Sequence, residues 1–161
     1  MAEQKLGSFE ALKSSMLSNG IIYQAYISDQ RLVAVKIGTP LEGGRGITMH
    51  FGLIGALIQY FLNKRVVKRR AALCAANETL SLDQLLQQDP KNFEVRYDSL
   101  EKAELKKSGM LKAGPAHLVL KPVAGDPVEL SLQTKDTLAK AMPLLEAGLK
   151  GRLETDAKLR A

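Results

Sequence analysis

The chain has little of several residue types, and each scarcity narrows what it can be. Its 161 residues include one cysteine, Cys74, two histidines and no tryptophan. A single thiol cannot form an internal disulfide, which favours a reducing compartment. The opening MAEQKLGSFEALK contains acidic residues and has no early apolar run, unlike a secretory signal. We therefore expect a cytoplasmic protein.

Residues with the spacing of a catalytic or metal site are also scarce. His50, His117 and Cys74 have no partner at the spacing of metal ligands or of an activated nucleophile. Residues 38–45, GTPLEGGR, lack the Gly-Lys-Ser/Thr of phosphate-binding loops. We therefore expect no catalytic residues, no metal and no cofactor, and the chain is predicted to be non-enzymatic.

What the sequence does contain is typical of one basic globular domain. The length lies near the modal domain size, and 45% of the residues are apolar and 25% are charged. The net charge of +6 favours acidic partners, such as phospholipid head groups, nucleic acid or acidic proteins. Charge alone does not choose among these three partners.

The most informative stretch is an uncharged segment followed by a basic run. Residues 46–63 contain no Asp, Glu, Lys or Arg, a length that suits either a buried helix or a marginal membrane span. The run that follows comprises Lys64, Arg65, Lys68, Arg69 and Arg70. These residues fit an anchor on an anionic membrane or acidic protein, a solvated helix end, or a nucleic-acid patch. Nucleic acid fits less well, because no aromatic residues are interleaved with the basic ones.

The uncharged segment itself has the pattern of a helix that packs closely against another backbone. Small or polar residues recur at steps of three and four on one stripe, and apolar residues cover the rest of the cylinder. The stripe consists of Thr48, Gly52, Gly55, Gln59 and Asn63. Small residues on a helix allow close approach, so we expect self-association through Gly52, Gly55 and Gln59, and hence a homo-oligomer.

Periodicity and turn residues predict the remaining elements. Ser8 is expected to cap a helix that ends at Gly20, and Ser81 with Gln84 forms a capping box for a second helix. The expected strands are residues 21–27, 32–37, 93–97, 100–105, 116–120 and 128–132. An amphipathic helix should begin near Thr134 and bury Leu138, Met142, Leu145, Leu149 and Leu153, with a kink or restart at Pro143.

Two of these segments resemble bacterial pleckstrin-homology-like (PH/GRAM-like) domains. Residues 27–36, ISDQRLVAVK, are similar to a polar-turn hairpin of that family, and residues 92–105, NFEVRYDSLEKAEL, are similar to its paired strands. The resemblance implies an α+β fold: a PH-like, partly open antiparallel β-barrel closed by a C-terminal amphipathic helix. Residues 43–90 depart from it as a helical insertion. The chain also lacks the clustered basic hairpin of phosphoinositide-binding members, so lipid-head-group specificity is not implied.

Together these features predict one PH-like domain over residues 1–153, with a flexible tail at 154–161. The expected function is a binding or scaffolding domain that self-associates and is recruited to anionic membranes, at their inner face, or to acidic proteins. The alternative is a basic accessory subunit of a ribonucleoprotein or another large assembly.

Overall fold

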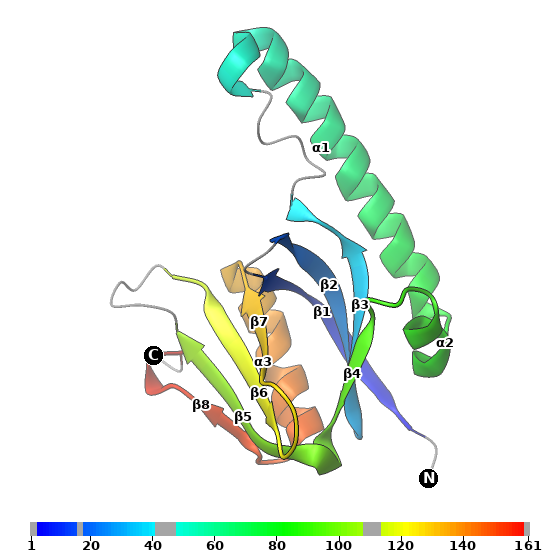
Figure 1. Cartoon of the computed structure of the whole chain (residues 1–161), viewed down its shortest axis with the longest axis vertical. Coiled ribbons are helices and arrows are strands. Elements are labelled where there is room, and N and C mark those ends of the chain that lie inside the picture. The colour runs from blue at the N-terminus through cyan, green and yellow to red at the C-terminus, as the bar shows by residue number, and fades with distance from the viewer. Residues whose placement is uncertain (1–2, 16–17, 41–47, 108–113, 160–161) are drawn as a thin grey trace.

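In the computed structural model, the chain is an α+β protein with a mostly open antiparallel sheet, and its described residues form three α-helices (Figure 1). The structure describes residues 3–15, 18–40, 48–107 and 114–159, but not the side chains of residues 15, 18, 19, 48–55, 58, 59 and 158. Within the described residues the sheet has eight strands in the order β4-β3-β2-β1-β7-β6-β5-β8. The strands are β1 (Lys5–Ser15), β2 (Ser18–Ser28), β3 (Arg31–Gly38), β4 (Phe93–Arg96), β5 (Leu100–Lys107), β6 (Ala116–Pro122), β7 (Val128–Leu132) and β8 (Leu153–Thr155). The helices are α1 (Thr48–Glu78), α2 (Leu82–Gln87) and α3 (Lys135–Leu149).

The first element is a strand, so the predicted helix over residues 8–20 is wrong. β1 pairs with β2 in an antiparallel register that runs from Lys5 opposite Ser28 to Ser15 opposite Ser18. Phe9 and Ala11 alternate with exposed Glu10 and face the core. The three-and-four spacing of apolar residues in this segment is therefore coincidental, and pairing with β2 decides its conformation.

The other predicted strands are present, and their turns follow the sequence signals. β2 and β3 form the hairpin expected around Ser28, whose hydroxyl accepts hydrogen bonds from the backbone of Gln30 and Arg31 at 3.1 and 2.9 Å. β6 and β7 form the second expected hairpin. The sheet's two parts, β1–β4 and β5–β7, meet where Leu12 of β1 pairs with Ser131 of β7.

The main core lies between these two parts of the sheet and α3. Its largest fully buried side chains come from all three, and they include Phe9, Ile27, Leu105, Leu118 and Leu145. Leu145 and Leu149 are 1% and 2% exposed, which confirms their predicted burial, whereas Leu138 and Met142 on the same face are half-buried. α3 begins after its predicted cap, Thr134, and continues through Pro143.

After α3 the described residues continue into a further strand and a 3-10 turn. Lys150 and Gly151 adopt positive φ angles of 46° and 86°, which end the helix and reverse the chain. Leu153, predicted as a helical residue, instead begins β8, which runs parallel to β5. A 3-10 turn at Ala157–Leu159 follows, within the segment predicted as a flexible tail.

Residues between β3 and β4 form the predicted helical insertion. α1 spans 31 residues and includes residues 48–63 of the uncharged segment and the whole basic run, whereas residues 46 and 47 lie outside the described residues. α2 begins at the predicted capping box, in which Ser81 Oγ accepts from Gln84 N and Gln84 Oε1 accepts from Ser81 N. Leu82 and Leu85 of α2 pack with Tyr26, Val33 and Val35 on the outer face of the sheet, forming a second, smaller core.

Candidate functional site

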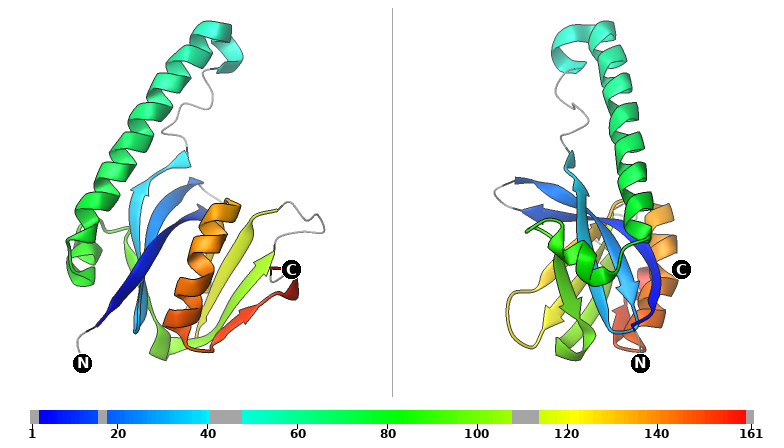
Figure 2. Two further views of the ribbon diagram at one scale, coloured as in Figure 1. Left: turned by 180° about the vertical axis from the view of Figure 1, so that it is seen from behind. Right: turned by 90° about the vertical axis from the view of Figure 1, so that its right-hand side faces the viewer.

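The most distinctive feature of the molecule is the part of α1 that projects from the body. Figures 1 and 2 show the N-terminal part of the helix extending well beyond the end of the sheet. We call residues 48–65 the arm and residues 66–78, which lie along the outer face of the sheet, the base. At 1.5 Å per residue, a helix of 31 residues is about 46 Å long, and only its C-terminal part lies against the sheet (Figure 1).

One stripe of α1 faces the body. Its side chains are half-buried or buried, and they recur at steps of four, four, four and three, as one side of a helix requires. These residues are Leu62, Val66, Arg70, Cys74 and Asn77. We call them the inward stripe. Because Arg70 and Asn77 are polar, this stripe cannot dock the base through apolar packing alone.

The base is instead docked by a polar network. Gln24 of β2 donates to Ser8 Oγ at 2.8 Å, and that hydroxyl donates to Glu78 Oε1 at 3.3 Å. The Cys74 thiol lies 3.7 Å from Gln24 Oε1, and burial raises its pKa, which keeps the thiol protonated as a donor. Buried polar groups with partners specify position more narrowly than apolar contacts do, so this network fixes where the base sits.

The C-terminal end of α1 is fixed by Lys5. Its Nζ donates to the carbonyl oxygens of Asn77 and Glu78 at 3.5 and 3.3 Å, and lies 4.4 Å from the centre of the Tyr26 ring. A cation at the end of a helix also complements the helix dipole. β1, which stands where a helix was predicted, thus supplies Lys5, the residue that binds the last carbonyl groups of α1.

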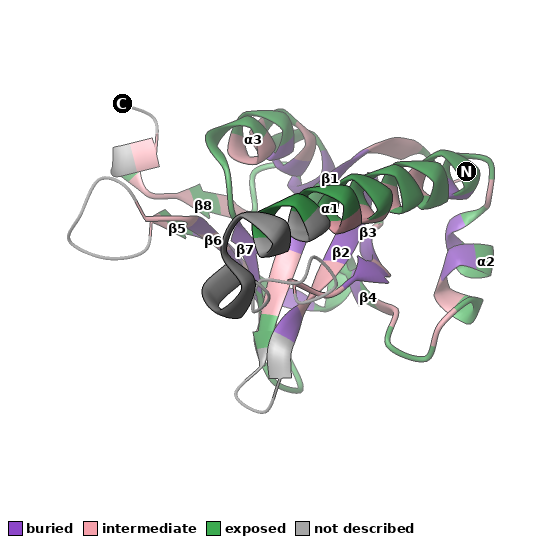
Figure 3. Cartoon of the chain, turned by 90° about the horizontal axis from the view of Figure 1, so that it is seen from above, coloured by how far each residue is buried: buried purple, intermediate pink, exposed green. Residues whose placement is uncertain are grey.

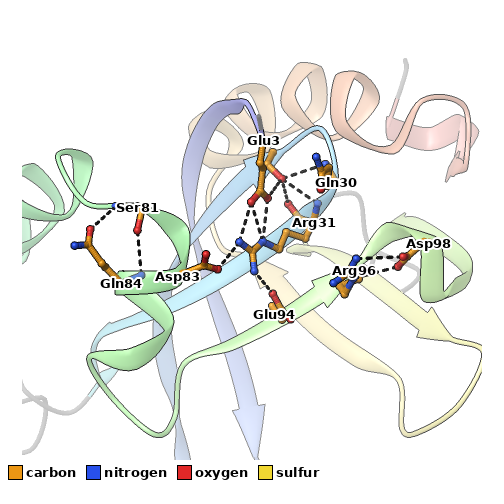
Figure 4. Close-up of polar contacts among 10 residues, drawn as sticks. Glu3, Gln30, Arg31, Ser81, Asp83, Gln84, Glu94, Arg96 and Asp98 are labelled. Atoms are coloured by element: carbon orange, nitrogen blue, oxygen red, sulfur yellow. Dashed lines mark hydrogen bonds and ion pairs between the residues drawn. The ribbon is translucent and has the colours of Figure 1, made fainter. Parts of the chain in front are cut away.

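α2 is tied to the body by Arg31 (Figure 4). The guanidinium lies 2.8 Å from Glu3, 2.6 Å from Asp83 of α2 and 2.5 Å from Glu94 of β4. Burial raises the pKa of Glu3, but hydrogen bonds from Arg31 and Ser28 outweigh it and leave that pKa lowered. Arg31 therefore joins four segments that are distant in sequence.

Four of the five residues in the predicted basic run are exposed. Lys64, Arg65, Lys68 and Arg69 form no ion pair or hydrogen bond with any described residue. Arg70 differs, because it is half-buried and its Nη2 donates to the Thr39 carbonyl at 2.8 Å. The structure thus separates Arg70, which holds α1 to the end of β3, from four cations available to a partner.

Large apolar side chains are exposed beside these cations. Leu57, Tyr60 and Phe61 are 60%, 61% and 58% exposed. Figure 3 shows exposed positions along the described part of α1, whereas buried positions gather on the sheet and on parts of α2 and α3. Three such side chains within two turns form a continuous apolar surface, and a surface of this kind marks an interaction site.

The exposed residues opposite the body form a second stripe. It consists of Leu57, Phe61, Lys64, Lys68, Ala72 and Ala75, spaced at three and four residues, and all six are exposed. We call it the outward stripe. From the arm toward the base it is first apolar, then basic and then alanine. No acidic residue occurs from position 43 to 77, so the only acidic residue of α1 is its last one, Glu78.

The residues predicted for self-association fall outside the description of side chains. Gly52, Gly55 and Gln59 belong to α1, but their side-chain surroundings are not among the described features. Self-association through them stays a prediction. No helix in the described residues is long and apolar enough to cross a membrane.

A second group of lysines, on β5 and β6, is arranged differently. Lys102, Lys106 and Lys121 lie 2.7, 2.5 and 3.3 Å from the carboxylate of Glu104, which is 6% exposed. Hydrogen bonds from Lys102 and Lys106 lower the pKa of Glu104 to about 2. These lysines are neutralised in part within the protein, whereas Lys64 and Lys68 of α1 have no such partner among the described residues.

A groove lies where α1 meets the body. It encloses about 490 Å³ between the start of the base, the ends of β1 and β2, and the start of α3. Leu12, Ile22 and Val66 line it together with Glu10 and Arg70. Opposite charges and apolar residues share this groove, so it favours no ligand class.

Comparisons with protein-family models, with curated proteins and with solved structures find no match to this chain. Within the described residues, no three His, Cys, Asp or Glu side chains are grouped to hold a metal ion. The arguments for function therefore rest on the chain's own residues.

The sequence predicts the basic run, but not the exposed site beside it. Leu57, Tyr60 and Phe61 belong to an apolar segment that suits burial, lipid or pairing equally well, and only the fold shows that they face away from the body. The sequence feature nearest to this site is the lack of acidic residues from 43 to 77, which leaves the adjoining basic run without an opposite charge nearby in the sequence.

Proposed function

We propose that this chain is a non-enzymatic binding module with a PH-like fold, recruited to anionic membrane surfaces through α1. The observation that carries the proposal is the exposure of Leu57, Tyr60 and Phe61 on a projecting helix, next to four exposed cations that pair with no described residue. Interfacial membrane helices combine these two features: apolar side chains enter the acyl boundary, and Lys or Arg binds lipid phosphates.

The topology supports a PH-like fold. Four antiparallel strands, β1–β4, are followed by three, β5–β7, the two groups meet at β1 and β7, and a helix after β7 packs on both. Two features are additions to that arrangement: the parallel strand β8 and the insertion between β3 and β4. The insertion is the element that the proposed function uses.

The expected free energies are sufficient for reversible binding. Each cation near an anionic leaflet contributes about 1 kcal/mol, so four contribute about 4 kcal/mol. Fully burying a large apolar side chain contributes about 1.5–3 kcal/mol, and each of the three is more than half exposed before binding. Neither group suffices alone once the cost of immobilising the protein is included. We therefore expect binding to need both.

The test is co-sedimentation with vesicles of phosphatidylcholine, with and without phosphatidylserine. We expect the parent to bind only the anionic vesicles, and added salt to release it because the cations are screened. Changing Lys64, Arg65, Lys68 and Arg69 to Gln should abolish binding, as should changing Leu57, Tyr60 and Phe61 to Ser.

Matched controls separate the site from net charge and general hydrophobicity. Changing exposed Lys91, Lys135, Lys140 and Lys150 to Gln removes the same charge elsewhere, and Val123→Ser removes an apolar side chain that is 73% exposed. Both variants should bind as the parent does. Equal losses in the control and site variants would contradict the proposal.

Other partners give distinguishable results. Sedimentation with RNA but not with anionic vesicles would favour the accessory subunit of a ribonucleoprotein. A dimer in light scattering, lost when Gly52 and Gly55 are changed to Leu, would favour self-association as the role of the arm. Binding to an acidic protein without vesicle binding would also overturn the membrane proposal.

A further inference from the structure

We propose that α1 meets the membrane obliquely, with the arm immersed in the interface and the base and body raised above it. This inference rests on the proposed function and adds the orientation of the bound protein. It follows from the order of residues along the outward stripe, which is apolar in the arm, basic at the junction and alanine in the base.

A helix that lies flat on a membrane separates its apolar and charged residues around its circumference. α1 separates them along its axis instead. Residues 46–63 carry no charge, whereas the outward stripe beyond Lys64 has no side chain larger than alanine except Lys68. Flat contact would place Ala72 and Ala75 on the bilayer and would bury little apolar area there. Contact through the arm buries Leu57, Tyr60 and Phe61, whereas the exposed large apolar side chains of the base, Val67 and Leu73, lie off the outward stripe.

Vertical insertion of the whole arm is also disfavoured, because the N-terminal part of α1 contains polar groups. Residues 48–62 extend about 22 Å, which is more than half the thickness of a hydrocarbon core of about 30 Å. Vertical insertion would therefore carry the start of the helix past the middle of the bilayer. The first turn of a helix has free N–H groups, and His50 and Gln59 are polar. Hydrocarbon cannot satisfy these groups, but water and lipid ester oxygens in the interface can. Immersion is therefore shallow.

The body permits this orientation. The arm extends beyond the sheet in the direction away from α3 and β8, so its tip reaches a surface before the body does (Figure 2). Lys64, Arg65, Lys68 and Arg69 lie at the junction of arm and base, where an oblique helix crosses the level of the phosphates. One geometry thus places apolar residues at the acyl boundary and cations at the head groups.

The absence of native tryptophan makes a direct test possible. Leu57 and Ala75 are exposed and 18 residues apart, which is about five turns, so they point in the same direction at different heights. We would compare Leu57→Trp, Phe61→Trp and Ala75→Trp on vesicles of phosphatidylcholine and phosphatidylserine. Bromine atoms at defined depths in the lipid chains would quench tryptophan by depth, and circular dichroism would confirm that each variant folds.

We expect a blue-shifted, quenched tryptophan at positions 57 and 61, with strongest quenching by bromine near the head groups, and no change at position 75. Equal quenching at 57 and 75 would mean that α1 lies flat. Strongest quenching at 57 by bromine near the chain ends would mean vertical insertion. Either result overturns the oblique orientation but leaves the proposed function standing. A parent that does not sediment with the vesicles refutes both.

Discussion

At the scale of single residues, Arg31 is the side chain on which the placement of the insertion depends most. It is 15% exposed and contacts three carboxylates, of which Glu3 is 21% exposed. Removing the guanidinium would leave Glu3 partly buried without its main partner, and Asp83 would no longer hold α2 against β3. Leaving a buried charge unpaired costs more than an exposed ion pair contributes.

We therefore predict that Arg31→Met lowers the free energy of unfolding by about 2–3 kcal/mol in urea denaturation. The matched control is Arg96→Met. Arg96 is 62% exposed and pairs with Asp98 at 3.4 Å, so its loss should cost less than about 1 kcal/mol. Equal costs for the two variants would show that the Arg31 cluster acts as an ordinary surface ion pair.

Residue-scale contacts show what sequence could and could not predict. The capping box of Ser81 and Gln84 was predictable, because its partners are three residues apart. The Arg31 cluster was not, because its carboxylates come from positions 3, 83 and 94 and meet only in the folded sheet. The contact of Arg70 with the body was likewise not predictable, since its partner Thr39 lies 31 residues away in the sequence.

At the scale of elements, hairpins and helices with local signals were predicted correctly, and the first strand was not. β2, β3, β6 and β7 are bounded by polar turns, so their sequence and their pairing agree. β1 carries a spacing of apolar residues that fits a helix, and only its long pairing with β2 overrides that spacing. β8 is too short, at three residues, to have a sequence signal.

One helical residue gives a prediction in which local preference and packing disagree. Alanine stabilises a helix interior by about 1 kcal/mol relative to glycine, so preference alone favours Gly148→Ala in α3. A Cβ at Gly148 would lie 2.7 Å from Ile27 Cγ2, 3.0 Å from the Ser28 carbonyl oxygen and 3.1 Å from the Tyr97 hydroxyl. Two of these neighbours are polar atoms in the core's tight packing.

We predict that Gly148→Ala is destabilising by about 1–3 kcal/mol in thermal or urea unfolding, because α3 must move away from β2. The control is the adjacent exposed Ala147, where the reverse change, Ala147→Gly, should cost about 1 kcal/mol through preference alone. A stabilised Gly148→Ala protein would show that α3 has room to shift on the sheet.

At the scale of the whole molecule, the chain separates into a body that folds around two cores and an arm that contributes little to either. The main core uses the sheet and α3, and the second uses the sheet and α2. Buried residues that hold α1 come from the base, such as Asn77. An element with few buried contacts is expected to matter for interaction more than for stability.

The excision of the arm tests this division. Arg70 contacts the Thr39 carbonyl, and Pro40 and Val66 line the same groove, so the two ends left by removing residues 41–65 lie close together. A short Gly-Ser linker should join them. We predict that this variant keeps the parental near-ultraviolet circular dichroism and melts within a few degrees of the parent, while losing binding to anionic vesicles.

A larger excision, of residues 41–90, should behave differently because it removes α2 as well. Tyr26, Val33 and Val35 would then lose the cover of Leu85 and become exposed on the outer face of the sheet. Exposing several large apolar side chains, each worth about 1.5–3 kcal/mol, would consume most of a stability of about 5–15 kcal/mol. We expect aggregation or non-cooperative melting. If the smaller excision also unfolds the protein, the arm contributes to the fold itself, and the exposure of Leu57, Tyr60 and Phe61 would lose its meaning as a binding signal.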